Sequence, residues 1–175
     1  AVRFIESDVA EVAQVTRLVT TAVDEFGGLH VMVNNAGVSG KMFAKFLDDD
    51  LADFHNVMAV NVLAVMAGTR DAARHMSKNG GGSIINLTSI GGIQAGGGGG
   101  VMTYRASKAA VIQFTKSAAI DLAHYEVRVN AIAPGNIRTA IVRKSASGGE
   151  DLQRLEEFEA KIREQMRNDR PLKRE

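Results

Sequence analysis

Hydrophobic residues along the chain follow two different patterns. From residue 9 to residue 26, apolar positions recur every three or four residues, which predicts a helix with one buried face. Short apolar runs bounded by Gly, Asn or Pro instead predict strands. The chain alternates between the two patterns. The strands are expected at residues 2–5, 29–33, 83–87 and Val127–Ile132, and the helices at residues 9–26, 48–75, 103–124 and 150–168.

Short strands that alternate with helices of this length are typical of βαβ units. We therefore expect an α/β fold, with one Rossmann-like domain over residues 1–175 and a doubly wound parallel sheet covered on both faces. In such a sheet, ligands bind at the carboxyl ends of the strands. The segments after Val33, Leu87 and Ile132 are therefore the first places to look for a site.

Composition narrows the class of protein. The chain has 175 residues, 45% hydrophobic and 23% charged, which is typical of a soluble globular domain. A net charge of +1 argues against nucleic acid or an anionic membrane as a partner. Without Cys there is no disulfide, Cys-based metal site or thiol nucleophile, and no metal site is expected. No apolar run is long enough to span a bilayer and no secretory signal pattern opens the chain, so a cytoplasmic location is expected.

Tyr104 and Lys108 are the first candidates for chemistry. They are four residues apart on an expected helix and therefore share a face. A lysine ammonium beside a tyrosine favours the phenolate, which makes the tyrosine a workable general acid/base. By itself this spacing is weak support, because most such pairs are surface contacts.

Ser89 and Asn61 are further candidates, each with a plainer alternative. Ser89 follows the expected strand 83–87 and could hydrogen-bond a substrate oxygen, although a loop Ser more often caps its own turn. Asn61 lies within an apolar helical stretch, where a buried amide needs partners. It is either a satisfied core residue or one that holds a water or kinks the helix at a site.

Taken together, these residues form a specific pattern. They are Asn34-Asn35-Ala36-Gly37 after a strand, Asn61, Ser89, Tyr104-x-x-x-Lys108 and Pro134-Gly135, in this order on an alternating chain. The sequence resembles the short-chain dehydrogenase/reductase family, and the likeness covers nearly the whole chain.

The resemblance implies catalytic roles for four residues. Tyr104 would exchange a proton with the substrate oxygen, and Ser89 would orient and polarise the substrate. Lys108 would favour the ionised form of Tyr104 and bind the nicotinamide ribose. Asn61 would hold a water that links Lys108 to solvent.

The resemblance also implies a nicotinamide cofactor, NAD or NADP, and a small alcohol or ketone as substrate. Adenine would contact Asp8 and Val9, the adenosine ribose would lie beside Asn34, Ala36 and Gly37, and the carboxamide end would lie near Ile137 and Thr139. The remaining expected cofactor-binding residues are Tyr104, Lys108, Pro134 and Gly135.

Charged residues concentrate toward the chain end, which predicts an exposed helix with a loop before it. The resemblance implies that residues 136–170 form a substrate loop and a lid helix within the domain. Arg138, Arg143 and Lys144 could favour an acidic substrate, although solvated loop charges are the commoner explanation. The helices at 48–75 and 103–124 carry more apolar surface than one sheet face covers. Relatives use the equivalent helices as an interface, so a homodimer or homotetramer is expected.

The chain departs from the family pattern in two respects. The Gly-rich turn that cradles the cofactor pyrophosphate is absent, and the likeness breaks off before the usual last helix and strand, so the domain is expected to be incomplete at both ends. Gly92, Gly96 and Gly98 imitate the spacing of that turn within a Gly run, but we assign them to a loop near the site. Ser89 and Tyr104 are 15 positions apart, slightly more than usual.

Two other functions remain open from the sequence. One is a non-redox enzyme of related fold, such as an epimerase or dehydratase acting on a cofactor-bound sugar. The other is a non-catalytic interaction domain that retains the fold. The segment Asn34-Asn35-Ala36-Gly37 favours the oxidoreductase over the first of these.

Overall fold

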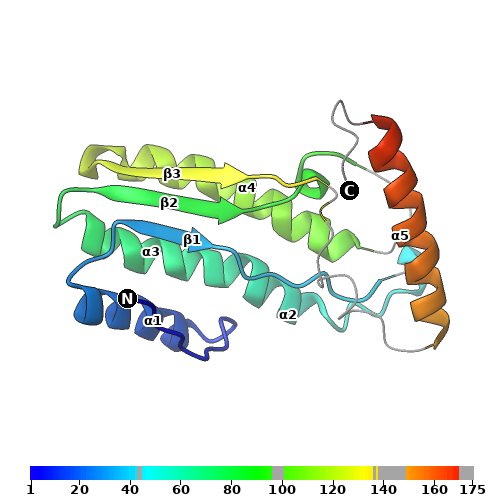
Figure 1. Ribbon diagram of the computed structural model, residues 1–175, viewed down its shortest axis with the longest axis horizontal. Coiled ribbons are helices and arrows are strands. Elements are labelled where there is room, and N and C mark those ends of the chain that lie inside the picture. Colours follow the sequence, from blue (N-terminus) through cyan, green and yellow to red (C-terminus); the bar gives the residue numbers. More distant parts are fainter. Residues whose placement is uncertain (43–44, 96–100, 136, 138–148, 170–175) are drawn as a thin grey trace.

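The computed structural model describes residues 1–42, 45–95, 101–135, 137 and 149–169. Three parallel strands form its sheet in the order β1-β2-β3 (Figure 1). They are β1 (Val31–Asn34), β2 (Gly82–Leu87) and β3 (Val127–Ile132). The helices are α1 (Val12–Phe26), α2 (Phe54–Met58), α3 (Ala64–Met76), α4 (Met102–Leu122) and α5 (Gly149–Asp169). The parallel α/β fold expected from the alternating pattern is confirmed.

Four short turns of helix complete the described elements. Three are 3₁₀ turns, η1 (Phe46–Asp48), η3 (Ile90–Gly92) and η4 (Ala123–Tyr125), and η2 (Ala59–Leu63) is a π-helical turn between α2 and α3. The strands are in register, with Asn34 opposite Asn86 and Asn86 opposite Ala131.

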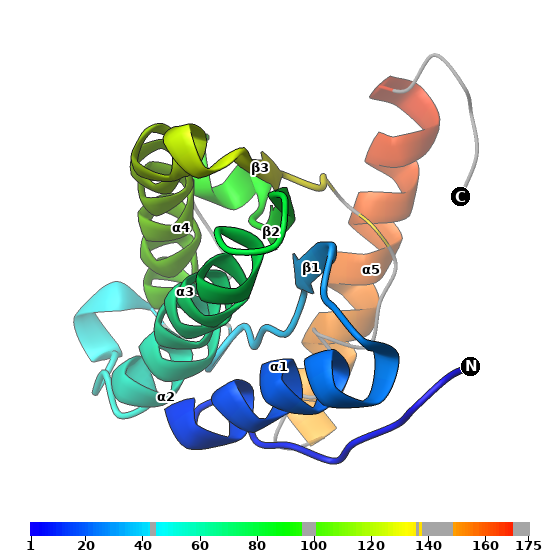
Figure 2. The ribbon, with the colours of Figure 1, turned by 90° about the vertical axis from the view of Figure 1, so that its left-hand side faces the viewer.

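One face of the sheet carries the core. Its centre is Ile84 on β2, which is fully buried. Helices α3 and α4 pack over this face, and α1 packs against α3 (Figure 2). The core cluster consists of Ala72, Ala73, Met76, Ile84, Ala118, Val127 and Val129. On the other face, Val31 and Val33 are 56% and 50% exposed, so in the described part of the chain helices cover one face of the sheet.

The strand expected at residues 2–5 is wrong. These residues form no strand, and Val2 and Phe4 are 98% and 86% exposed. A strand is stable when a neighbour pairs with its backbone groups. In the described residues the sheet consists of β1, β2 and β3, and residues 2–5 pair with none of them.

The helix expected at residues 48–75 is present, because α2, η2 and α3 follow one another without a gap from Phe54 to Met76, but it begins later than predicted. Leu51 adopts a left-handed backbone (φ 54°). The carboxylates of Asp49 and Asp50 accept hydrogen bonds from the backbone N–H groups of Leu51 and Ala52. Such local bonds offer the backbone an alternative to the helix, and α2 begins only at Phe54.

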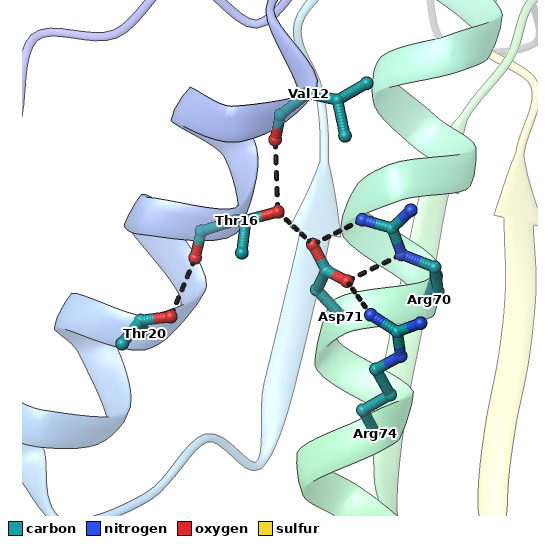
Figure 3. Close-up of polar contacts among 6 residues, drawn as sticks. All are labelled: Val12, Thr16, Thr20, Arg70, Asp71 and Arg74. Atoms are coloured by element: carbon teal, nitrogen blue, oxygen red, sulfur yellow. Dashed lines mark hydrogen bonds and ion pairs between the residues drawn. The ribbon is translucent and has the colours of Figure 1, made fainter.

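A buried carboxylate ties α1 to α3 (Figure 3). The side chain of Asp71 is 5% exposed and accepts a 2.6 Å hydrogen bond from the Thr16 hydroxyl on α1. The guanidinium of Arg70 bonds both carboxylate oxygens, and Arg74 adds a third contact. The Arg70 hydrogen bonds, with help from Thr16 and the charge of Arg74, lower the pKa of Asp71 despite its burial.

We predict that Asp71→Asn lowers the free energy of unfolding by about 1–3 kcal/mol at neutral pH, because hydrogen bonds to a buried charge are lost. Since the pKa of Asp71 is lowered in the folded state, its contribution exists above the unfolded-state pKa and is lost as the pH falls through the folded-state pKa. Urea unfolding at a series of pH values from neutral to acidic should therefore show that the difference in the free energy of unfolding between parent and variant becomes smaller. The exposed pair Asp50–Lys41 supplies the control, and Asp50→Asn should change stability little. A difference in the free energy of unfolding that is the same at every pH would contradict the stabilising role of the Asp71 charge.

Candidate active site

The segments that follow the three strands meet at one edge of the sheet. Thr88, directly after β2, donates both its N–H (2.8 Å) and its hydroxyl (3.1 Å) to the carbonyl of Ile132 at the end of β3. The N–H of Ile90 donates to the carbonyl of Pro134 at 3.0 Å. These bonds place Ser89 beside the segment containing Gly135, as expected for the carboxyl edge of a parallel sheet.

Lys108 connects α4 to this edge. Its side chain is nearly buried, and Nζ donates a 2.9 Å hydrogen bond to the carbonyl of Leu87, the last residue of β2. Nζ also lies 5.7 Å from the centroid of the Tyr104 ring. Burial lowers the pKa of Lys108, since it disfavours the ammonium. The structure therefore brings Tyr104 and Lys108 together as the helical spacing predicts.

Ser89 faces the same cluster. Its Oγ accepts a 3.1 Å hydrogen bond from the N–H of Gly91, which is the turn-capping contact that the sequence left open as an alternative. The hydroxyl proton is not used by this bond and remains able to donate. A Cβ atom at Gly91 would lie 3.4 Å from Ser89 Oγ and 3.9 Å from Tyr104 Cε1. Both side chains therefore lie next to Gly91, on the side where other residues carry a side chain.

Asn61 is fully buried in the π-helical turn η2, a type of irregularity frequent at functional sites. Its amide forms two hydrogen bonds with the backbone of Val38, one to the carbonyl and one from the N–H, both 2.9 Å long. The Asn61 amide is thus a buried group whose hydrogen bonds are formed, and the residue also lies where the helix departs from α-helical geometry. A Cβ atom at Gly37 would lie 3.4 Å from both Asn61 Oδ1 and Lys108 Nζ, which places the loop after β1 against both residues.

The side chain of Asn34 points into the protein and bonds there. Its amide nitrogen donates to Asn86 Oδ1 (2.8 Å) and to Thr69 Oγ1 (3.2 Å). Asn86 in turn donates to Thr115 Oγ1 on α4 at 3.0 Å. Asn34 therefore positions the loop after β1, in which Ala36 is exposed.

The remaining candidates are more dispersed. Asp8 Oδ1 accepts a hydrogen bond from the N–H of Ala10, and Val9 packs against the cluster formed between α1 and α3. Ile137 is 61% exposed. Outside the described residues lie Thr139, the basic side chains Arg138, Arg143 and Lys144, and most of the expected substrate loop.

Sequence reasoning missed Ser107. This residue is fully buried, donates to the backbone carbonyl of Tyr104 (2.7 Å) and accepts from Asn61 Nδ2 (2.9 Å). A signal for it was present, because a small polar residue three positions after Tyr104 shares its helix face.

In the described part of the chain, no helix is long and apolar enough to cross a membrane. The same residues contain no group of three or more His, Asp or Glu side chains that could hold a metal ion.

The fold and this cluster define the class of the protein. A family model described as Enoyl-(Acyl carrier protein) reductase matches residues 1–173. The resemblance based on the motifs is confirmed, and the chain belongs to the short-chain dehydrogenase/reductase family.

Individual relatives agree with this assignment. The chain is 41% identical over 139 residues to a 3-alpha-(or 20-beta)-hydroxysteroid dehydrogenase of Mycobacterium bovis, covering 79% of this chain and 52% of the relative. Among solved structures, ElxO with NADP bound has a TM-score of 0.74 at 33% identity, covering 81% of this chain and 56% of that one. NAD+-bound xylitol dehydrogenase has a TM-score of 0.71 at 34% identity, covering 78% and 52%. The chain spans about half the length of the curated relatives that it matches.

Gly92 allows η3 to contact α4. A Cβ atom at this position would lie 2.7 Å from backbone atoms of Lys108 and Ala109, closer than carbon atoms approach one another. At Gly91 the nearest atom would be 3.4 Å away and belongs to a side chain.

We therefore predict that Gly92→Ala lowers the free energy of unfolding by about 1–3 kcal/mol, because η3 must move away from the α4 backbone. The matched variant Gly91→Ala should stay within about 0.5 kcal/mol of the parent. Chemical denaturation of both variants measures the difference. Equal stability of the two would show that η3 does not pack on α4 in this way.

Proposed function

We propose that the protein is an NAD(P)-dependent oxidoreductase that transfers a hydride between a nicotinamide cofactor and an alcohol or carbonyl substrate. The observation that carries the proposal is the position of Lys108 Nζ, 5.7 Å from the Tyr104 ring centroid and bonded to Leu87 at the carboxyl edge of the sheet, while Ser89 Oγ and Tyr104 Cε1 both lie next to Gly91. The family to which the chain belongs supports it, as do the dehydrogenase names of its relatives.

The residues at this edge fit the nicotinamide and ribose half of such a cofactor. Gly37 leaves the space beside Lys108 Nζ free of a side chain, and the neighbouring Ala36 is exposed. We propose that Tyr104, Lys108 and the segment from Pro134 hold this half, with Ile137 and Thr139 near the carboxamide. The loop after β1 would lie beside the adenosine ribose, and Asp8 and Val9 near adenine. When bound, the cofactor supplies the hydride acceptor or donor. Either NAD or NADP is compatible with the proposal, since related structures hold one or the other.

Tyr104 is the proposed acid/base. In the oxidation direction its phenolate oxygen takes the hydroxyl proton of the alcohol, and in reduction its phenol returns the proton to the carbonyl oxygen. The Lys108 ammonium favours the phenolate by its charge. Ser89 donates a hydrogen bond to the substrate oxygen with the proton that its turn leaves free. Asn61 is proposed to hold a water that links Lys108 to solvent for proton transfer. Its side-chain amide is hydrogen-bonded to the backbone of Val38.

We also propose that residues 136–170 close over the substrate as a loop and lid helix within the one domain. Helix α5 lies beyond the end of the sheet toward which the strands point (Figure 1), and Leu155 on it is 3% exposed. A cytoplasmic location is part of the proposal and rests on the sequence.

The test is cofactor binding and turnover by the intact protein. We expect NADH or NADPH to bind, measured by nicotinamide fluorescence, and a panel of alcohols and ketones to show turnover in the absorbance of reduced nicotinamide. Tyr104→Phe should lower kcat at least about 100-fold, because the proton donor is lost while the ring and the other proposed cofactor-binding residues remain. The second Tyr of the chain gives a matched control: Tyr125 is 46% exposed in η4, and Tyr125→Phe should leave kcat unchanged.

Each other outcome excludes a specific idea. If neither cofactor binds, the oxidoreductase proposal is wrong, and a non-catalytic interaction domain remains as the explanation. Binding with conversion of a sugar but no net redox change would favour the epimerase or dehydratase. Full activity of Tyr104→Phe would remove Tyr104 from the mechanism.

We propose in addition that the protein is a homodimer or homotetramer formed through α3 and α4. Several large apolar side chains on α2, η2, α3 and α4 are exposed by 40% or more. They are Phe54, Leu63, Met66, Met102 and Ile120. Faces of this kind are buried in symmetric interfaces.

The prediction is that light scattering gives the mass of at least two chains and that Ile120→Lys reduces it, because Ile120 is 80% exposed on α4 and a charge there would be desolvated in the interface. Phe26→Lys serves as the control, since Phe26 is 52% exposed on α1, a helix that is not part of the proposed interface. A monomeric mass for the parent protein would contradict the proposal.

A further inference from the structure

We propose that Ser107 is a positioning residue of the active site. Its hydroxyl connects the first turns of α4, which carry Tyr104, to Asn61 and through Asn61 to the loop that follows β1. The inference rests on the proposed oxidoreductase function and adds to it a residue that touches neither substrate nor cofactor.

The hydroxyl of Ser107 both donates and accepts a hydrogen bond. The residue is 0% exposed, so no solvent reaches it. Oγ donates to the carbonyl of Tyr104 at 2.7 Å and accepts from Asn61 Nδ2 at 2.9 Å. A hydroxyl has one proton to give, and here that proton goes to the backbone of the proposed acid/base itself.

Asn61 continues the connection. The Nδ2 group that bonds Ser107 also donates to the carbonyl of Val38, and Oδ1 accepts from the N–H of Val38, each at 2.9 Å. The preceding residue, Gly37, is where a Cβ atom would lie 3.4 Å from Lys108 Nζ. A continuous set of hydrogen bonds therefore runs from the backbone of Tyr104 to the loop beside Lys108.

Loss of the Ser107 hydroxyl removes one partner from a buried amide. An unpaired buried N–H group costs free energy, so Asn61 or the start of α4 shifts to find another partner. Either shift moves Tyr104 relative to Ser89 and to the loop after β1. Proton transfer depends steeply on such distances, and a small displacement of the acid/base lowers kcat.

The same helix holds a close structural equivalent. Thr115 is 4% exposed, donates its hydroxyl to the carbonyl of Val111 at 2.7 Å and accepts from Asn86 Nδ2 at 3.0 Å. Like Ser107, it joins an α4 carbonyl to a buried asparagine. It lies eight residues further along α4, toward the end away from Tyr104. Asn86 uses its other atom, Oδ1, to accept from Asn34, so removing the Thr115 hydroxyl leaves the Asn34–Asn86 bond in place. The change should therefore disturb stability in a similar way and leave the site unaltered.

The experiment compares Ser107→Ala with Thr115→Val in the intact protein. Both should lower Tm by a similar amount, because each removes a hydroxyl and retains the bulk of the side chain. Only Ser107→Ala should lower kcat, by about tenfold or more, with the KM for cofactor and for substrate within about threefold of the parent. Ser107→Thr retains the hydroxyl and should restore kcat to within about threefold of the parent.

A kcat for Ser107→Ala within about twofold of the parent would overturn the inference, as would an equal loss of kcat in Thr115→Val. If Ser107→Ala does not fold, Ser107→Cys takes its place, since a thiol fills similar space but donates and accepts only weakly. A parent protein without cofactor binding or turnover overturns the proposed function itself. An active parent with an unaffected Ser107→Ala overturns only the role of Ser107.

Discussion

Three buried asparagine side chains determine how the strands and helices of this protein meet. Asn34, Asn61 and Asn86 are 8%, 0% and 0% exposed. A buried amide group without a partner costs about 1–3 kcal/mol, so the elements that supply partners are held in place. Asn34 and Asn86 join β1 to β2 and both to helices, while Asn61 joins η2 to the loop after β1 and to α4. In the described residues, no buried side-chain N or O atom lacks a hydrogen bond.

Close backbone contacts complete the site that this network supports. Gly92 brings η3 to the α4 backbone beside Lys108, and Gly37 brings the loop after β1 to Lys108 Nζ. Burial of Lys108 is unfavourable for its charge, and the hydrogen bond to the Leu87 carbonyl partly offsets this. The ammonium is thereby held near the Tyr104 ring at the carboxyl edge of the sheet.

Much of the fold could be read from local patterns. Strand β3 was predicted with its observed bounds, and the expected strands at 29–33 and 83–87 differ from β1 and β2 by one or two residues at their ends. Hydrophobic runs and Gly or Pro boundaries are local signals, which explains this agreement. The helix expected at 48–75 begins only at Phe54, because two Asp side chains bond their own turn before α2. The strand at 2–5 is not formed, because a strand also needs a neighbour.

The sequence by itself determined the order of elements and, through helical spacing, that Tyr104 and Lys108 share a face of α4. Tertiary structure decided which polar groups pair. Asn61 bonds Val38 and Ser107, which are 23 and 46 positions away, and Lys108 bonds Leu87 across 21 positions. Residue types and periodicity describe one element at a time, whereas these bonds depend on how separate elements pack. For that reason the proton-transfer candidates could be found in the sequence, whereas the hydrogen bonds that join Ser107 to Tyr104 and Asn61 could be found only in the fold.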